Sequence, residues 1–161
     1  MTTLKYLVAL IVALAALLLT AGQLGFLSGT MPATLGVIQG RLSPPSTTAN
    51  SVSSQAGLYP DHPQKEYASI APLRFTGDGD VAMEKLAGVL RESARTVVIH
   101  QIPGYIYAQA TTQWLKFTDD VEFWFDRENQ VIQVRSASRL GQKDLGINRA
   151  RIEAIRARFN F

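Results

Sequence analysis

The chain has 161 residues, no cysteine and a formal net charge of +3. This length allows one small domain beside an N-terminal segment, and the lack of cysteine excludes disulfides and thiolate chemistry. Residues 61–128 hold 11 acidic and 7 basic side chains, whereas residues 135–161 hold 2 acidic and 7 basic ones. This basic end is modest and shows no recognisable nucleic-acid-binding module, so we expect no nucleic-acid partner.

The N-terminal residues predict a membrane or export element. From Tyr6 to Leu27 the chain has 22 residues without a charge. A helix of that length, rising about 1.5 Å per residue, can cross a hydrocarbon core of about 30 Å. A cleaved signal peptide is the alternative, with an apolar run over residues 6–19 and small residues at 20–22. We favour an uncleaved anchor, because the apolar character continues to Leu27.

The flanking charge predicts an orientation for this element. Lys5 and the α-amine favour a cytoplasmic N-terminus by the positive-inside tendency. The protein is then a single-pass protein of the bacterial inner membrane with its domain on the periplasmic side, and it contacts the lipid bilayer through residues 6–27. With a cleaved signal it would be an exported soluble periplasmic protein.

Composition divides the chain into three parts. Residues 42–64 are rich in Ser, Thr, Pro and Asn, which is typical of an irregular tether. We therefore expect an anchor or signal at residues 1–29, an irregular segment at 30–69 and a folded domain at 70–161.

Two helices are expected in the folded domain. The first is predicted over residues 81–92, with Asp78 or Asp80 as its N-cap. The second follows Asn148, which we expect to cap it. Its apolar stripe consists of three residues near the C-terminus, namely Ile152, Ile155 and Phe159.

Four strands are expected between these helices. Alternating β-branched and aromatic residues predict them at residues 96–101, 105–112, 117–125 and 131–138. The order of elements indicates an α+β fold, in which a mainly antiparallel sheet of about four strands has both helices packed on one face.

The last two strands place charged residues opposite one another. A turn at residues 128–129 pairs Glu122 with Arg135 and sets Asp120 diagonal to Arg135 and Arg139. A slip of one residue would put phenylalanines beside charges, which favours this register.

Two interpretations of this charged ladder are open. It is either a set of solvated ion pairs, each worth well under ~1 kcal/mol, or a recognition surface for a small polar ligand or an envelope protein partner. In the second case the loop at residues 139–144 forms its roof. The candidate binding residues are Asp120, Glu122, Arg135, Ser138, Arg139, Asp144, Asn148 and Arg149.

Catalytic and metal sites have little support in the pattern. Asp119, Asp120 and Glu122 could act as a base or as metal ligands, but strand alternation sends Asp119 to the opposite face. His62 and His100 have no spacing that links them to a nucleophile. We assign no catalytic residue, metal or cofactor and favour a non-enzymatic binding or accessory domain. The alternative is a hydrolase or transferase that uses a carboxylate on a polar envelope substrate.

The polar motifs resemble those of a known family. They are Val52-Ser-Ser-Gln55, Ile70-Ala-Pro-Leu73, Asp119-Asp-Val-Glu-Phe123, Val134-Arg-Ser-Ala-Ser-Arg-Leu-Gly141, Asp144-Leu-Gly146 and Asn148-Arg149. From about Leu35 to the C-terminus, the chain is similar to the domain-of-unknown-function family numbered fourteen-ninety-nine. The resemblance implies a small membrane-anchored envelope protein or a chloroplast protein, without an established activity.

The chain departs from the family pattern at two positions. Pro45 and Ser51 stand where the pattern has cysteines. Their joint loss is typical of a dispensable structural disulfide and not of a metal or redox site. The resemblance also implies that residues 50–55 pack on the domain, contrary to what composition indicates.

Overall fold

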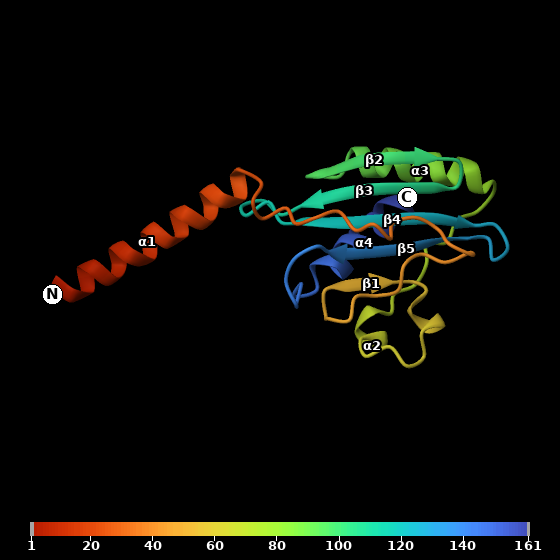
Figure 1. The fold of residues 1–161 in the computed structure, drawn as a ribbon. Helices are drawn as coiled ribbons and strands as arrows, with labels where there is room; N and C mark the ends of the chain where they lie inside the picture. The colour runs from red at the N-terminus through yellow and green to blue at the C-terminus, as the bar shows by residue number, and fades with distance from the viewer. Residues whose placement is uncertain (1, 161) are drawn as a thin grey trace.

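A computed structural model describes residues 2–160 as an apolar helix that extends from an α+β domain (Figure 1). Helix α1 (Thr2–Gln23) has a mean hydropathy of 2.4 over its most apolar window, and none of that window is buried in the protein. Its length and composition suit a membrane anchor, and they equally suit a signal sequence near the N-terminus. The apolar N-terminal element predicted from the sequence is therefore confirmed as a helix.

The domain is built on one antiparallel sheet with the strand order β1-β5-β4-β3-β2. Its strands are β1 (Ser51–Ser53), β2 (Thr96–Ile102), β3 (Tyr105–Thr111), β4 (Thr118–Asp126) and β5 (Val131–Ser138). The α+β class and the four predicted strands are confirmed. The fifth strand, β1, lies where composition predicted an irregular tether, so that expectation is wrong for residues 51–53. Val52 is 1% exposed in the core, and its burial explains why this segment docks on β5 despite its polar composition.

Two long helices, α3 (Gly79–Arg91) and α4 (Ile147–Phe159), pack on the same face of the sheet (Figure 1). The short segments η1 (Ala56–Leu58) and α2 (Lys65–Ala68) lie beyond β1. Asp78 caps α3, because its carboxylate accepts hydrogen bonds from the backbone N–H groups of Asp80 and Val81. Of the two predicted candidates, Asp78 and Asp80, Asp78 is therefore the N-cap.

The core lies between this helix pair and the sheet. Apolar side chains from every other position of β4 and β5 meet those of the helices, and the fully buried ones include Phe123, Val134, Leu86 and Ile152. Burial of a side chain of this size stabilises the fold by about 1.5–3 kcal/mol. The period of two in these strands therefore sends the residues between them, Asp120 and Glu122 among them, to the opposite face.

Asn148 does not cap α4, contrary to our prediction. The N-cap position is Gly146, whose φ of 83° lies in the left-handed region that favours glycine. The carboxylate of Asp144 accepts hydrogen bonds from the backbone N–H groups of Gly146 and Asn148, at 3.0 and 3.1 Å. Asp144 thus supplies the capping interaction, and the Asn148 side chain turns inward.

The predicted register of the last hairpin is confirmed. Glu122 faces Arg135, and Phe123 faces Val134. The connection is longer than the two-residue turn that we expected, because β4 ends at Asp126 and β5 begins at Val131. The pairing is the same in both cases, since the extra residues are added equally on the two sides.

Candidate functional site

A network of tyrosines, carboxylates and arginines lies on the face of the sheet opposite α3 and α4. Glu122 is 0% exposed and accepts hydrogen bonds from Tyr105 Oη at 2.8 Å and from the backbone N–H of Gly36 at 2.8 Å. It also forms an ion pair with Arg135 Nη1 at 3.2 Å. The carboxylate therefore has three protein partners and no exposure to bulk solvent.

Asp120, two residues before Glu122 on β4, forms a second group of a carboxylate, an arginine and a tyrosine. Arg139 donates to it from Nε at 2.9 Å and from Nη2 at 2.7 Å, and Tyr107 donates from Oη at 2.6 Å. The hydrogen bond to Asp120 raises the pKa of the Arg139 guanidinium, although desolvation opposes it. Asp120 is 1% exposed, so this pair is also sealed from solvent.

The two tyrosines of this network are held neutral. Burial raises the pKa of Tyr105 and of Tyr107, and the neighbouring carboxylates Glu122 and Asp120 raise it further. Each hydroxyl therefore stays a hydrogen-bond donor at any physiological pH. The hydrogen bonds from the two hydroxyl groups to Glu122 and Asp120 therefore hold the phenol rings in position.

Residues 35–44 cover the network. Leu42, 1% exposed, packs against Tyr105 and Tyr107, and the carbonyl oxygen of Pro44 accepts a hydrogen bond from Arg135 Nε at 3.3 Å. Gln55 holds the cover in place, because its side-chain oxygen accepts from the backbone N–H of Leu42 at 2.8 Å. The interpretation of the ladder as solvated ion pairs is therefore wrong, and the roof is residues 35–44 and not the loop at 139–144.

A second polar cluster lies on the helix-bearing side. Asn148 is 0% exposed and donates to the carbonyl of Asn50 at 3.0 Å, to Ser138 Oγ at 3.0 Å and to Asp144 Oδ2 at 2.8 Å. Its own oxygen accepts from Ser136 Oγ at 2.5 Å. This amide ties the residue that precedes β1 to β5 and to the start of α4.

Two arginines of α4 complete the second cluster. Arg149 donates to the backbone carbonyls of Tyr67 and Ser69, at 2.6 and 2.9 Å, and so holds the segment around α2. Arg151 forms an ion pair with Asp119 at 2.5 Å. Asp119 therefore lies on the opposite face of the sheet from Asp120, as predicted.

The structure thus divides the eight candidate residues between two places. Asp120, Glu122, Arg135 and Arg139 belong to the network under residues 35–44. Ser138, Asp144, Asn148 and Arg149 belong to the cluster at the start of α4. All eight have partners within the protein, and no single surface presents them together.

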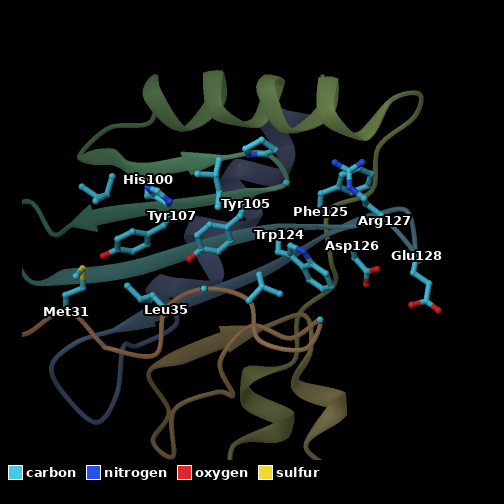
Figure 2. Close-up of a pocket in the computed structure, with 17 residues that line it drawn as sticks. Met31, Leu35, His100, Tyr105, Tyr107, Trp124, Phe125, Asp126, Arg127 and Glu128 are labelled. Carbon is cyan, nitrogen blue, oxygen red and sulfur yellow. The ribbon is translucent and has the colours of Figure 1, made fainter.

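Beside the covered network lies an open groove of about 910 Å³ (Figure 2). The cover contributes one wall of the groove and strands β2 to β4 contribute the other. Its apolar lining includes Met31, Leu35, Val37, Ile102, Tyr105 and Trp124. Figure 2 shows Met31 and Glu128 at opposite ends of the groove. Sequence reasoning missed this groove, because its cover lies in a segment that composition marks as irregular.

The end of the groove at the β4–β5 turn is polar. Asp126 accepts hydrogen bonds from Gln133 and Asn129, at 3.0 and 2.8 Å. Desolvation alone would raise the pKa of Asp126, but these hydrogen bonds outweigh it and lower the pKa. Arg127 lies 4.8 Å from the Phe125 ring centroid and pairs with Asp80 at 2.8 Å. A carboxylate held anionic and a guanidinium therefore mark this end.

Other candidate chemistry finds little support in residues 2–160. No group of three or more His, Asp or Glu side chains in this range could hold a metal ion. His100 is exposed at the groove wall, and Trp124 packs beside Leu42. Trp114 is 67% exposed in the loop between β3 and β4.

Stability is expected to fall at acid pH through Asp144. Burial would raise the pKa of this carboxyl, but hydrogen bonds from Tyr67, Gly146 and Asn148 outweigh it and lower the pKa below the ordinary value of 3.8. A group with a depressed folded-state pKa stabilises the fold above its unfolded pKa, and that contribution is lost as the pH falls through the folded value. The midpoint of thermal unfolding should therefore decline below about pH 4.

The Asp144→Asn variant tests this dependence. Its unfolding midpoint, measured by circular dichroism, should be lower at neutral pH and change less on acidification than that of the wild type. Asp61→Asn, at an exposed position, is the matched control and should keep the wild-type slope. An unchanged slope in Asp144→Asn would contradict the assignment.

These features define a class: an α+β domain behind an apolar N-terminal helix, with a covered polar network and an adjoining apolar groove. The sequence matches the profile of the family described as Protein of unknown function (DUF1499) over residues 41–159. The chain therefore belongs to this family, which confirms the resemblance noted in its motifs. No curated protein and no solved structure matches the chain.

Proposed function

We propose that this protein is a non-enzymatic binding domain, anchored in the bacterial inner membrane, that holds an elongated apolar ligand of the lipid-chain type in its groove. The groove lining carries the proposal. Its volume of about 910 Å³ lies within the range of about 300–1,000 Å³ that ligand pockets span. Aliphatic and aromatic side chains form its body, and charged residues gather at the turn that closes one end.

In this proposal the buried network prepares the groove and does not touch the ligand. Tyr105 and Tyr107 line the groove, and Glu122 and Asp120 fix their hydroxyls from below. A binding wall that is already ordered loses less conformational entropy when a ligand binds. Asp120, Glu122, Arg135 and Arg139 therefore support the binding surface from beneath.

The anchor places the groove near its source of ligand. Helix α1 is uncharged after Lys5, and only 11 residues lie between Gln23 and Leu35, which lines the groove. We propose that Lys5 keeps the N-terminus in the cytoplasm and that the domain lies on the periplasmic side. If the segment were cut as a signal, the same domain would be a soluble periplasmic protein.

The buried carboxylates favour binding over catalysis. A carboxylate-dependent hydrolase or transferase needs a carboxyl group that reaches a substrate. Asp120 and Glu122 are 1% and 0% exposed, and arginine and tyrosine donors occupy their oxygens. No observation at these residues supports the enzymatic alternative over the binding one.

A photoreactive phospholipid with a diazirine in its acyl chain tests the proposal in the full-length chain reconstituted in nanodiscs. Ile102→Asp places a charge in the groove wall and should reduce labelling of the domain several-fold. Val97→Asp is the matched control, because Val97 is an exposed aliphatic residue of the same strand that does not line the groove. It should label like the wild type.

Labelling of α1 serves as the internal standard, since both variants leave it unchanged. Equal domain labelling in the two variants would contradict a lipid site in the groove. Crosslinking of the groove to a co-purifying polypeptide, in place of lipid, would favour the envelope protein partner as the occupant.

A further inference from the structure

We propose that the loop between β3 and β4, residues 112–117, is a second membrane contact that seats Trp114 in the headgroup region of the bilayer. The loop would then hold the domain in one orientation on the membrane. This proposal rests on the part of the proposed function that makes α1 a retained anchor. It does not depend on what the groove binds.

The first observation is that the end of α1 is docked on this loop. Gly22 is buried, and a Cβ at this position would lie 2.5 Å from the carbonyl oxygen of Leu115. The side chain of Gln23 donates to the carbonyl oxygen of Trp114 at 3.0 Å. Figure 1 shows α1 meeting the end of the sheet where β3 ends and β4 begins. The helix end and the loop therefore lie at one level.

That level coincides with the surface of a bilayer that α1 spans. The 18 residues of α1 that follow Lys5 are about 27 Å long, close to the hydrocarbon thickness of about 30 Å. With the N-terminal end of α1 at one surface, Gln23 reaches the opposite one. Trp114 is hydrogen-bonded to Gln23 through its backbone and lies at the same depth.

The second observation is the set of apolar side chains exposed at the junction, where the end of α1 contacts the loop. Trp114 is 67% exposed, and on the other side of the contact Leu24 and Phe26 are 67% and 76% exposed. Single exposed apolar side chains are ordinary, but these three flank one docking point. Tryptophan is enriched where its ring meets headgroups, and Lys116 in the same loop suits an anionic lipid surface.

The membrane contact of the loop would orient the groove relative to the bilayer. Met31 lies at the groove end nearer the junction, and Glu128 lies at the other end (Figure 2). The Met31 end of the groove then faces the bilayer, and the charged turn at Glu128 points away from it. A cut at residues 20–22 would remove the contact of Gly22 with the loop, so the docking also favours an uncleaved anchor.

The two tryptophans of the chain allow a direct test. Trp124→Phe leaves Trp114 as the only reporter, and Trp114→Phe leaves Trp124 in the groove wall. Each full-length variant is reconstituted in vesicles of phosphatidylcholine and phosphatidylglycerol with bromine either near the headgroup end or near the methyl end of the acyl chain. Trp114 emission should be lost mainly with the shallow bromine, and aqueous iodide should quench it weakly.

The outcomes separate this proposal from the one on which it rests. Strong iodide quenching and no bromine effect on Trp114, in a chain that resists extraction by alkaline carbonate, would overturn the loop contact and leave the anchor intact. Release of the chain by carbonate would overturn both. Trp124 reports the groove independently, so loss of lipid from the groove does not alter the result for Trp114.

A second variant guards against a folding defect in Trp124→Phe. The chain has no cysteine, so Trp114→Cys offers a single site for a nitroxide label. The label should be more accessible to oxygen than to a water-soluble nickel chelate. The reverse order would contradict the membrane contact.

Discussion

Replacement of Glu122 by alanine is expected to lower the free energy of unfolding by about 3–5 kcal/mol. The variant leaves the charge of Arg135, a residue 7% exposed, buried without its partner. It also removes the acceptor for Tyr105 Oη and for the backbone N–H of Gly36. The loss is a large share of the 5–15 kcal/mol that a typical domain has, and urea unfolding of the full chain at neutral pH measures it.

A double variant separates loss of the pair from loss of packing. Glu122→Met combined with Arg135→Leu removes both charges and should be clearly more stable than Glu122→Ala, because apolar replacement of a buried pair is often nearly neutral. If Glu122→Ala costs under ~1 kcal/mol, the pair behaves as a solvated one, and the burial under residues 35–44 is contradicted.

Replacement of Asn148 by alanine is the second change expected to have a large effect. It would leave the buried Ser136 O–H without its acceptor, at a cost of about 1–3 kcal/mol. It would also remove one of the two hydrogen bonds to the Asn50 carbonyl, which keeps the one from the Ser138 N–H. Because Asn148 connects β1 to α4, the edge strand should loosen first. Hydrogen exchange of the β1 amides, measured beside urea unfolding, should show a loss of protection there.

Asn160→Ala is the matched control for this change. Asn160 is an exposed asparagine just beyond the other end of the same helix, and its replacement should leave β1 protection unchanged. Equal exchange of the β1 amides in Asn148→Ala and wild type would show that the amide does not hold β1.

The regular elements were predictable from local pattern alone. The apolar spacing in α3 and the period of two in β4 and β5 reflect a core on one face, so they also fixed the pairing of Glu122 with Arg135. β1 was not predictable in this way, because its polar residues Ser51 and Ser53 have no period and only Val52 is apolar. The motif Val52-Ser-Ser-Gln55 was the one signal, through its resemblance to the family.

The site was predictable only in part. The register placed Glu122 and Arg135 on one face, but their burial depends on residues 35–44, where Gly36 donates to Glu122 and Pro44 accepts from Arg135. Leu42 packs on Tyr105 and Tyr107 through contacts far apart in the sequence. The apolar residues Leu35, Val37 and Leu42 lie among glycines without a helical or strand period. The groove that Leu35 and Val37 line beside β3 therefore had no local signature.

The most direct measurement is the map of residues that carry the photoreactive phospholipid in the wild-type chain, read by peptide mass spectrometry. A lipid-binding groove on a membrane anchor predicts label in α1 and, separately, on groove residues such as Leu35 and Ile102. Label confined to α1, with none on the groove walls, would contradict a lipid-binding function for this domain.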